Sequence, residues 1–210
     1  ELATHAPGEL RAARLPELRY VIRMCDTETP GMLTFSDVIE QGRASLDVAR
    51  LDAIGATLSA HEPINIQFTS GTTGNPKGAT LTHSNVVNNA RYIAMAMRLS
   101  EQDSLCIPVP LYHCFGMVLA VLACVSVGAN MVFPGEGFDP LATLSAVAEE
   151  KCTALHGVPT MFIAELDHPE FSRFDLSRLR TGIMAGSPCP IETMKKVVSK
   201  MHLAEITIAY

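Results

Sequence analysis

Basic side chains are sparse in this sequence and form no run. The 210 residues include 16 Lys and Arg against 22 Asp and Glu, which gives a formal net charge of −6. Surfaces that bind nucleic acid need clustered positive charge, so we expect no nucleic-acid partner. A phosphate group bound by this protein must therefore be held locally, by backbone amides and single side chains.

Paired cysteines and membrane-length apolar runs are also missing. The six cysteines are scattered and form no Cys-x-x-Cys pair, which indicates reduced thiols in a compartment of the cytosolic type. The most apolar stretch, 114–127, is shorter than the ~20 residues that cross a bilayer, so we expect a buried helix there and no transmembrane segment. A bacterial-type cytoplasm is the expected location, with the mitochondrial matrix as the alternative for a eukaryotic protein.

Short apolar strands alternate with amphipathic helices along most of the chain. The clearest helix places Val86, Val87, Ala90, Ile93, Ala94 and Met97 on one stripe. This alternation predicts an α/β fold with a mostly parallel sheet and helices on both faces. We expect strands at 18–24, 64–68, 105–109, 130–133, 153–155, 182–185 and 206–210, and helices at 34–42, 86–97, 115–127, 160–166 and from 140 and 190 onward. The segment 42–61 has no clear period and is expected to cross the surface.

A loop rich in glycine and hydroxyl groups follows the expected strand at 64–68. Its glycines can adopt positive φ and approach a ligand closely, while its hydroxyls and amides supply donors for phosphate oxygens. Lys77 adds a positive charge that can reach the terminal phosphates. The loop comprises Thr69, Ser70, Gly71, Thr72, Thr73, Gly74, Asn75, Pro76, Lys77 and Gly78.

This loop is not a Walker A motif, because that motif requires Ser or Thr directly after the lysine and Gly78 stands there. A P-loop NTPase is therefore disfavoured. We expect the loop to join two strands and to fold over phosphates as a flap. For a generic glycine-rich loop, a flexible surface turn is the alternative.

The same string resembles the signature of the acyl-adenylate-forming (AMP-binding) superfamily, which includes acyl-CoA synthetases, adenylation domains of peptide synthetases and firefly-type luciferases. The resemblance extends from residue 63 to 210, and it is strongest toward medium- and long-chain fatty-acyl-CoA synthetases of the acyl-CoA synthetase family member 2 type. That closer match depends on Pro-Ile-Asn-Ile-Gln-Phe at 63–68 and Ala-Gly-Ser-Pro at 185–188. It implies an incomplete preceding subdomain and connecting segment at 1–62, a truncated AMP-binding subdomain at 63–210, and no C-terminal domain.

A second matching segment, 108–117, reads Pro-Val-Pro-Leu-Tyr-His-Cys-Phe-Gly-Met. The resemblance implies that His113 lies near the reacting carboxylate. It also implies that the acyl tunnel is walled by Phe115, Gly116 and Met117, where glycine leaves room and methionine adapts to alkyl chains. Taken by itself, His113 fits a histidine that caps a helix.

A third segment ends an expected strand in small residues, namely Ala185, Gly186, Ser187 and Pro188. A flat base can lie against such a backbone, and the resemblance implies one wall of the adenine pocket. Tyr210 matches a tyrosine that covers the other face of adenine in the family, where stacking contributes about 1–3 kcal/mol judging by nucleic-acid cases. Without the resemblance, the segment is an ordinary strand-to-helix turn.

The implied reaction has two steps, in which a carboxylate attacks the α-phosphate of ATP and CoA then takes the acyl group. Fatty acid, ATP and CoA are the implied small-molecule partners, and a homodimer is compatible with the resemblance. Mg²⁺ is implied with its Glu ligand beyond the last residue, so we assign no metal ligand here. Because the family's catalytic Lys is absent too, the isolated chain is expected to be inactive.

Two alternatives remain beside a fatty-acyl-CoA synthetase. One is an aryl- or amino-acid-adenylating enzyme of the same fold, although no Asp that could bind a substrate amine stands near His113. Another is a nucleotide-binding or structural piece without catalysis. A Cys114–His113 nucleophile pair is disfavoured, because adjacent side chains point apart and no third group is evident.

Overall fold

The computed structural model describes residues 1–69 and 74–209. They form two compact units, 1–58 and 59–210, which are described separately. The larger unit confirms the predicted fold class, because a five-stranded parallel sheet lies between two sets of helices. In the described part of the chain, no helix is both long enough and apolar enough to span a bilayer.

The five-stranded sheet has the order β6-β5-β7-β8-β9, and each strand is parallel to its neighbours. The second strand in this order, β5, pairs Leu105 with Met131 on one side and with Ala154 on the other. The strands are β5 (Ser104–Cys106), β6 (Asn130–Val132), β7 (Ala154–Gly157), β8 (Thr181–Ala185) and β9 (Glu205–Ala209).

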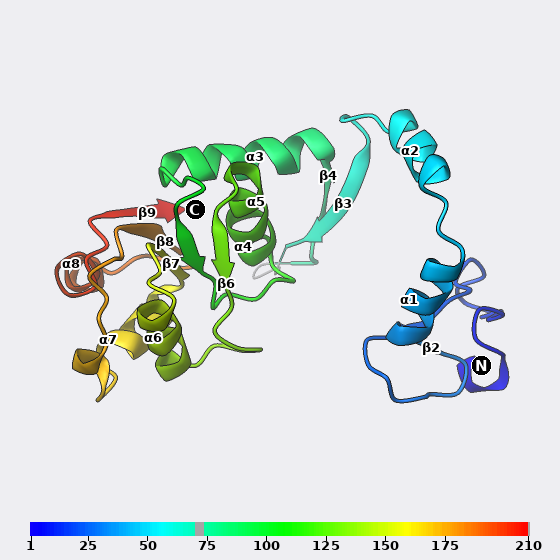
Figure 1. The fold of residues 1–210 in the computed structure, drawn as a ribbon, viewed down its shortest axis with the longest axis horizontal. Coiled ribbons are helices and arrows are strands. Elements are labelled where there is room, and N and C mark those ends of the chain that lie inside the picture. The colour runs from blue at the N-terminus through cyan, green and yellow to red at the C-terminus, as the bar shows by residue number, and fades with distance from the viewer. Residues whose placement is uncertain (70–73, 210) are drawn as a thin grey trace. The chain divides into compact units, whose positions relative to one another are not determined.

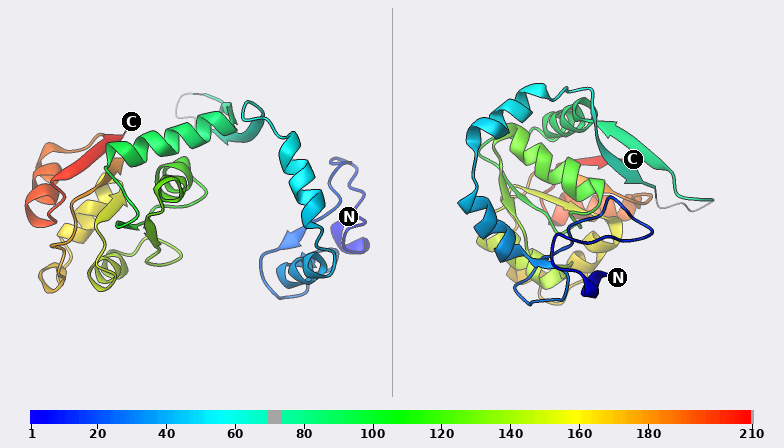
Figure 2. Two further views of the ribbon diagram at one scale, coloured as in Figure 1. Left: turned by 45° about the horizontal axis from the view of Figure 1, so that its top comes forward. Right: turned by 90° about the vertical axis from the view of Figure 1, so that its right-hand side faces the viewer.

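Helices cover both faces of this sheet, as Figures 1 and 2 show. One face packs against α3 (His83–Ala96) and the continuous helical segment formed by α4 (Cys114–Gly116), η2 (Met117–Leu122) and α5 (Ala123–Val127). The other face packs against α6 (Pro140–Glu149), α7 (Pro159–Leu166) and α8 (Ile191–Lys200). Side chains of consecutive strand residues alternate between the two cores: Ile183 belongs to the first and Met184 to the second.

The strand connections reverse direction between β5 and β7. From β5 the chain passes through α4–α5 to β6 at one edge, and it then returns through α6 to β7 on the other side of β5. Such a switch point leaves a crevice outside the carboxyl ends of the strands, where open α/β sheets bind ligands. The segments after Cys106 and after Gly157 lie at this point.

An antiparallel hairpin precedes the sheet, formed by β3 (Pro63–Phe68) and β4 (Gly78–Thr82). This confirms the prediction that the glycine-rich loop joins two strands. Thr82 then caps α3, because its hydroxyl accepts a hydrogen bond from the Asn85 backbone and the Asn85 side chain accepts one from the Thr82 backbone. Leu81 packs beside Val86 and Ala90 of that helix.

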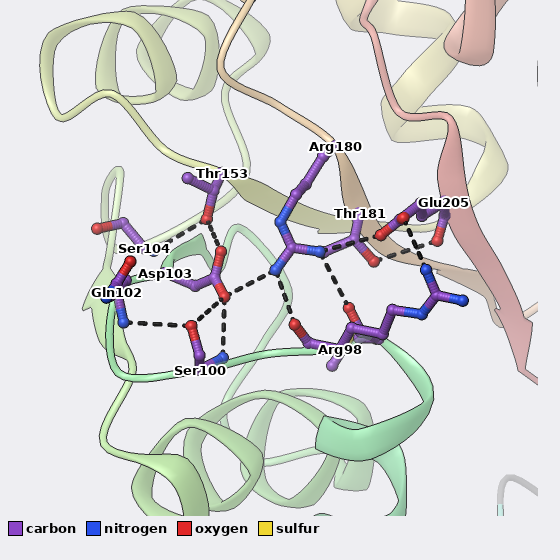
Figure 3. Close-up of polar contacts among 10 residues, drawn as sticks. Arg98, Ser100, Gln102, Asp103, Ser104, Thr153, Arg180, Thr181 and Glu205 are labelled. Atoms are coloured by element: carbon purple, nitrogen blue, oxygen red, sulfur yellow. Dashed lines mark hydrogen bonds and ion pairs between the residues drawn. The ribbon is translucent and has the colours of Figure 1, made fainter.

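A polar cluster joins the amino ends of the strands (Figure 3). It therefore lies at the opposite end of the strands from the switch-point segments, which follow the carboxyl ends. The Arg180 guanidinium donates to Asp103 at 2.7 Å, to Glu205 at 3.0 Å and to the Arg98 carbonyl at 2.8 Å. Asp103 also accepts from the Thr153 hydroxyl at 2.7 Å. These contacts connect the residues that precede or begin β5, β7, β8 and β9.

The smaller unit has little regular structure. It contains η1 (Leu2–Thr4), a two-residue parallel pair β1 (Ile22–Arg23) and β2 (Leu33–Thr34), α1 (Phe35–Ala44) and α2 (Val48–Thr57). A capping box formed by Thr34 and Asp37 begins α1. Two predictions are wrong, because strand 18–24 shrinks to two residues and α1 continues through Gly42. The segment 42–61 is exposed, in agreement with its predicted place at the surface, and it also contains a helix capped by Asp47 that was not predicted.

Other differences concern element lengths and faces in the larger unit. Strand 105–109 ends at Cys106, because Ile107 and the prolines that follow leave the β5–β7 ladder. Val87, assigned to the buried stripe, is 57% exposed, whereas Val86 is buried. The helix at 115–127 is present but includes a π-helical segment, and a short 3₁₀ turn, η3 (Phe171–Arg173), was not predicted.

Candidate functional site

Two hydrogen bonds close the base of the glycine-rich loop. The Thr69 amide donates to the Lys77 carbonyl at 2.9 Å, and the Lys77 amide donates to the Thr69 hydroxyl at 3.1 Å. Gly74, Asn75, Pro76, Lys77 and Gly78 are all exposed, as a loop that meets a ligand must be. Ser70, Gly71, Thr72 and Thr73, which we predicted to contact phosphates, lie outside the described residues.

The segment after β5 places His113 at the start of the helix that follows. Its ring Nδ1 accepts a hydrogen bond from the Phe115 amide at 3.1 Å, so the histidine does cap α4. When the ring is neutral, the proton resides on Nε2, which faces away from that cap and can donate to a ligand. The Cys114 sulfur lies 3.8 Å from the same Nδ1 atom, which already accepts the backbone proton.

Gly116 is tightly enclosed at this helix start. A Cβ atom added there would lie 2.4 Å from the Pro110 carbonyl oxygen, far inside contact distance. The glycine therefore allows the helix to approach the segment that leads into it. This close approach is a reason for glycine at 116 that is independent of the predicted acyl tunnel.

The next turns form a π-helix over Met117–Leu122, a conformation that is frequent at functional sites. Its Leu119 carbonyl oxygen lies 3.0 Å from Nε2 of His156, at the carboxyl end of β7. On the other side of the ring, Nδ1 accepts the Ile183 amide at 3.2 Å, so Nε2 carries the proton and donates. The ring also stacks on Phe115, with centroids 5.3 Å apart.

His156 is therefore neutral and fully buried. Burial lowers its pKa from 6.5 to about 4, and the hydrogen bonds to the Leu119 and Leu155 backbone only partly oppose this shift. Sequence reasoning did not single out this residue, because a histidine inside an apolar strand gives no functional signal. Its connection to the predicted acyl wall is shown by the stacking on Phe115 and by the contact with Leu119, 37 residues earlier.

The turn after β8 presents exposed backbone at the same edge of the sheet. Ala185 is buried at the strand end, whereas Gly186, Ser187 and Pro188 are exposed. Gly186 has φ of +87°, and an added Cβ would lie 3.0 Å from the Val158 side chain, which follows β7. The segments that follow the carboxyl ends of β7 and β8 are therefore in contact. Tyr210, which we predicted to complete the adenine pocket, lies outside the described residues.

The structure therefore gathers the predicted segments at one edge of the sheet. His113 and Phe115 follow β5, Val158 follows β7, and Gly186 follows β8. The hairpin that carries Lys77 packs on α3, which covers one face of the same sheet.

Comparison with known proteins identifies the family. Residues 9–210 match the AMP-binding enzyme family. The chain belongs to this family.

Several relatives match the whole chain. YngI of Bacillus subtilis (strain 168), an acyl-CoA synthetase by name, is 54% identical over 210 residues, and the chain covers 38% of its length. The mitochondrial medium-chain acyl-CoA ligase ACSF2 of Danio rerio is 44% identical over 212 residues, with 35% of its length covered. The chain thus spans little more than a third of these relatives.

A solved structure also matches the fold. The anthranilate CoA ligase AuaEII, in complex with anthranoyl-AMP, has a TM-score of 0.79 and 26% identity. The match covers 93% of this chain and 37% of that one. The resemblance to acyl-CoA synthetases stated from the motifs is therefore confirmed at the level of the family and of its named members.

Proposed function

We propose that this chain is the nucleotide- and acyl-binding part of an ATP-dependent acyl-CoA synthetase that activates a fatty acid as its acyl adenylate. The observation that carries the proposal is the convergence of the His113, Gly157 and Gly186 segments at the carboxyl ends of three adjacent parallel strands. The AuaEII neighbour supports it, because that protein was solved with an acyl adenylate bound.

In this proposal each segment has a distinct task. The loop 69–78 holds the pyrophosphate portion of ATP through backbone amides, hydroxyls and the Lys77 charge. The exposed backbone at 185–188 receives the adenine, together with Tyr210. His113 donates from Nε2 to the carboxylate of the fatty acid, and Phe115, Gly116 and Met117 form the wall beside the alkyl chain.

The chemical difficulty lies in bringing two anions together. A carboxylate oxygen must attack the α-phosphorus while pyrophosphate leaves, so positioned donors supply most of the rate enhancement. CoA then takes the acyl group in a second step and AMP is released. Residues 1–69 and 74–209 contain no group of three or more His, Cys, Asp or Glu side chains arranged to hold a metal.

The test of the phosphate role is Lys77→Ala in the full-length protein. We expect acyl-adenylate formation, measured by acid-dependent exchange of pyrophosphate into ATP, to fall at least about tenfold, or ~1.4 kcal/mol at the transition state. Lys196→Ala, an exposed lysine on α8, is the matched control and should leave the rate unchanged. A fall of less than about threefold, ~0.7 kcal/mol, would contradict the assignment.

An aryl-adenylating enzyme is the second candidate, favoured by the match to an anthranilate CoA ligase. Pyrophosphate exchange with decanoate, benzoate and a panel of amino acids separates the two candidates. We expect decanoate to support exchange. We also propose that the protein is located in the cytosol or in the mitochondrial matrix, and the ACSF2 relative is mitochondrial by name. The same proposal includes assembly as a homodimer.

A further inference from the structure

His156 lies outside the phosphate, adenine and carboxylate segments, yet it contacts Phe115 of the predicted acyl wall and Leu119 in the π-helix that continues from this wall. Its Nε2 donates to Leu119 in the π-helix, and its ring stacks on Phe115 at the helix start. A π-helix is less stable than an α-helix of the same length and persists where outside contacts hold it. His156 supplies such a contact from the central part of the sheet.

The hydrogen bonds of this ring leave no freedom in its orientation. The Ile183 amide donates to Nδ1 from the neighbouring strand, which fixes the tautomer that donates to Leu119. The ring is fully buried, so the loss of either bond would leave an unpaired polar group inside the core. The sheet thereby determines where the helix and the Phe115 ring stand.

We propose that His156 is a positioning residue for the acyl site: by bonding Leu119 and stacking on Phe115, it fixes the wall that selects the alkyl chain. This inference rests on the proposed function. His156 does not touch the fatty acid in this proposal, and it acts through the helix it holds. The side chain should therefore affect recognition of the acid much more than recognition of ATP.

Three substitutions separate its contacts. His156→Gln can still place a donor near the Leu119 carbonyl, because its amide nitrogen reaches the position of Nε2. His156→Asn reaches only the position of Nδ1 and loses the bond to Leu119. His156→Phe keeps a ring against Phe115 but loses both hydrogen bonds.

The measurement is KM for fatty acids of increasing length and KM for ATP, in the full-length protein. We expect the Asn and Phe variants to raise KM for the preferred acid about tenfold and to shift the preferred length, with KM for ATP within about twofold. The Gln variant keeps the bond to Leu119 but loses the ring that stacks on Phe115, so its KM for the acid should lie between those of the wild type and the Asn variant. Thr181→Val, which removes a buried hydrogen bond to the Glu205 carbonyl at the other end of β8, is the control and should change neither constant.

Two further readouts keep the test decisive. Phe115→Leu removes the stacked ring without touching His156 and should reproduce the shift in length preference, even where a His156 variant fails to fold. Amide hydrogen exchange of 114–123 should quicken in the Asn variant and not in the Gln variant, independently of activity. Unchanged acid KM in both the Asn and Phe variants would overturn the inference alone. Absence of acid-dependent exchange in the wild type would overturn the proposed function, and the inference with it.

Discussion

Single buried residues show how strongly the interior constrains a titratable group. Both ring nitrogens of His156 have backbone partners, and the residue serves as a rigid connector. Glu165 on α7 is equally buried, but neither of its carboxylate oxygens has a hydrogen-bond partner among the described residues. Burial raises the pKa of Glu165 well above its ordinary value, because the charged form is poorly solvated there.

Replacing Glu165 should therefore stabilise the protein. In the wild type the unfolded chain releases this proton first as pH rises above about 4.5, so the free energy of unfolding falls with rising pH in that range. We expect Glu165→Met to raise the free energy of unfolding at pH 7 by about 1–3 kcal/mol, because it removes an unsatisfied polar group. Glu165→Gln should flatten the decline in stability above pH 4.5.

Urea denaturation between pH 4 and pH 8 measures both effects. Glu192→Gln is the matched control, since Glu192 is exposed and paired only with Lys195 on the same helix. Equal or lower stability of the Met variant at pH 7 would mean that Glu165 has a partner or ligand in solution.

Prediction from sequence succeeded for some residue roles and failed for others for a definable reason. The caps at Thr34, Thr82 and Asp139 involve neighbours three residues away, which is the range over which local sequence can indicate a contact. Burial of His156 against Leu119 depends on residues 37 positions apart, and no local pattern encodes it.

At the scale of elements, periodicity identified the helices whose apolar stripe is buried. The stripe of α3 led to its correct assignment, since Val86, Ala90 and Ala94 are all buried. Helix α2 was missed because none of its residues is buried in the structure. A helix with no buried face needs no apolar stripe in its sequence, so periodicity did not reveal it. The π-helical segment was not predicted because the run 114–127 is apolar on all sides. Such a run has no alternation of apolar and polar residues, so its number of residues per helical turn cannot be inferred from the sequence.

Strand β8 depends on a glycine whose reason is visible only in three dimensions. Gly182 pairs with Leu155 of β7, and an added Cβ would lie 1.8 Å from the Leu155 carbonyl oxygen. Gly182→Ala should therefore destabilise the protein by more than about 4 kcal/mol, in the range reserved for severe core defects. Gly137→Ala, where an added Cβ meets nothing within 4 Å, is the paired control and should cost little.

Thermal unfolding, monitored by circular dichroism, distinguishes these two glycine variants. We expect Gly182→Ala to unfold far below the wild type or to be insoluble. A Tm within a few degrees of the wild type would show that β7 and β8 can separate at this point without loss of the sheet.

At the scale of the whole larger unit, the polar cluster of Figure 3 holds the amino ends of four strands. Burial alone would raise the pKa of Asp103, but hydrogen bonds from Thr153, Ser100 and Arg180 outweigh it and lower the pKa below its usual value. A carboxylate of this kind stabilises the fold above its unfolded pKa of about 3.8, and the contribution is lost as pH falls through the folded value.

Asp103→Asn should lower the free energy of unfolding at pH 7 by about 1–3 kcal/mol, because Arg180 and Thr153 lose a charged acceptor. Glu205→Gln is the comparison: Glu205 also pairs with Arg180, but its side chain is 41% exposed, so we expect a cost of about 0–1 kcal/mol. The Asp103→Asn variant and the wild type should converge as pH falls below 3.8 and through the lowered pKa of folded Asp103. Denaturant titrations at pH 7 and at a series of pH values below 3.8 measure this, and an equal cost for both substitutions at pH 7 would contradict the role of burial.

The all-parallel sheet also dictates an order of events during folding. Leu105 and Ala154 are paired between β5 and β7, but in the sequence an entire strand and two helical connections separate them. The β3–β4 hairpin closes within a short loop and can form in about 1–10 μs. The sheet must wait for distant segments to meet, which slows its formation. On a ribosome, the hairpin bearing the predicted phosphate loop would therefore be shaped well before the sheet beneath it exists.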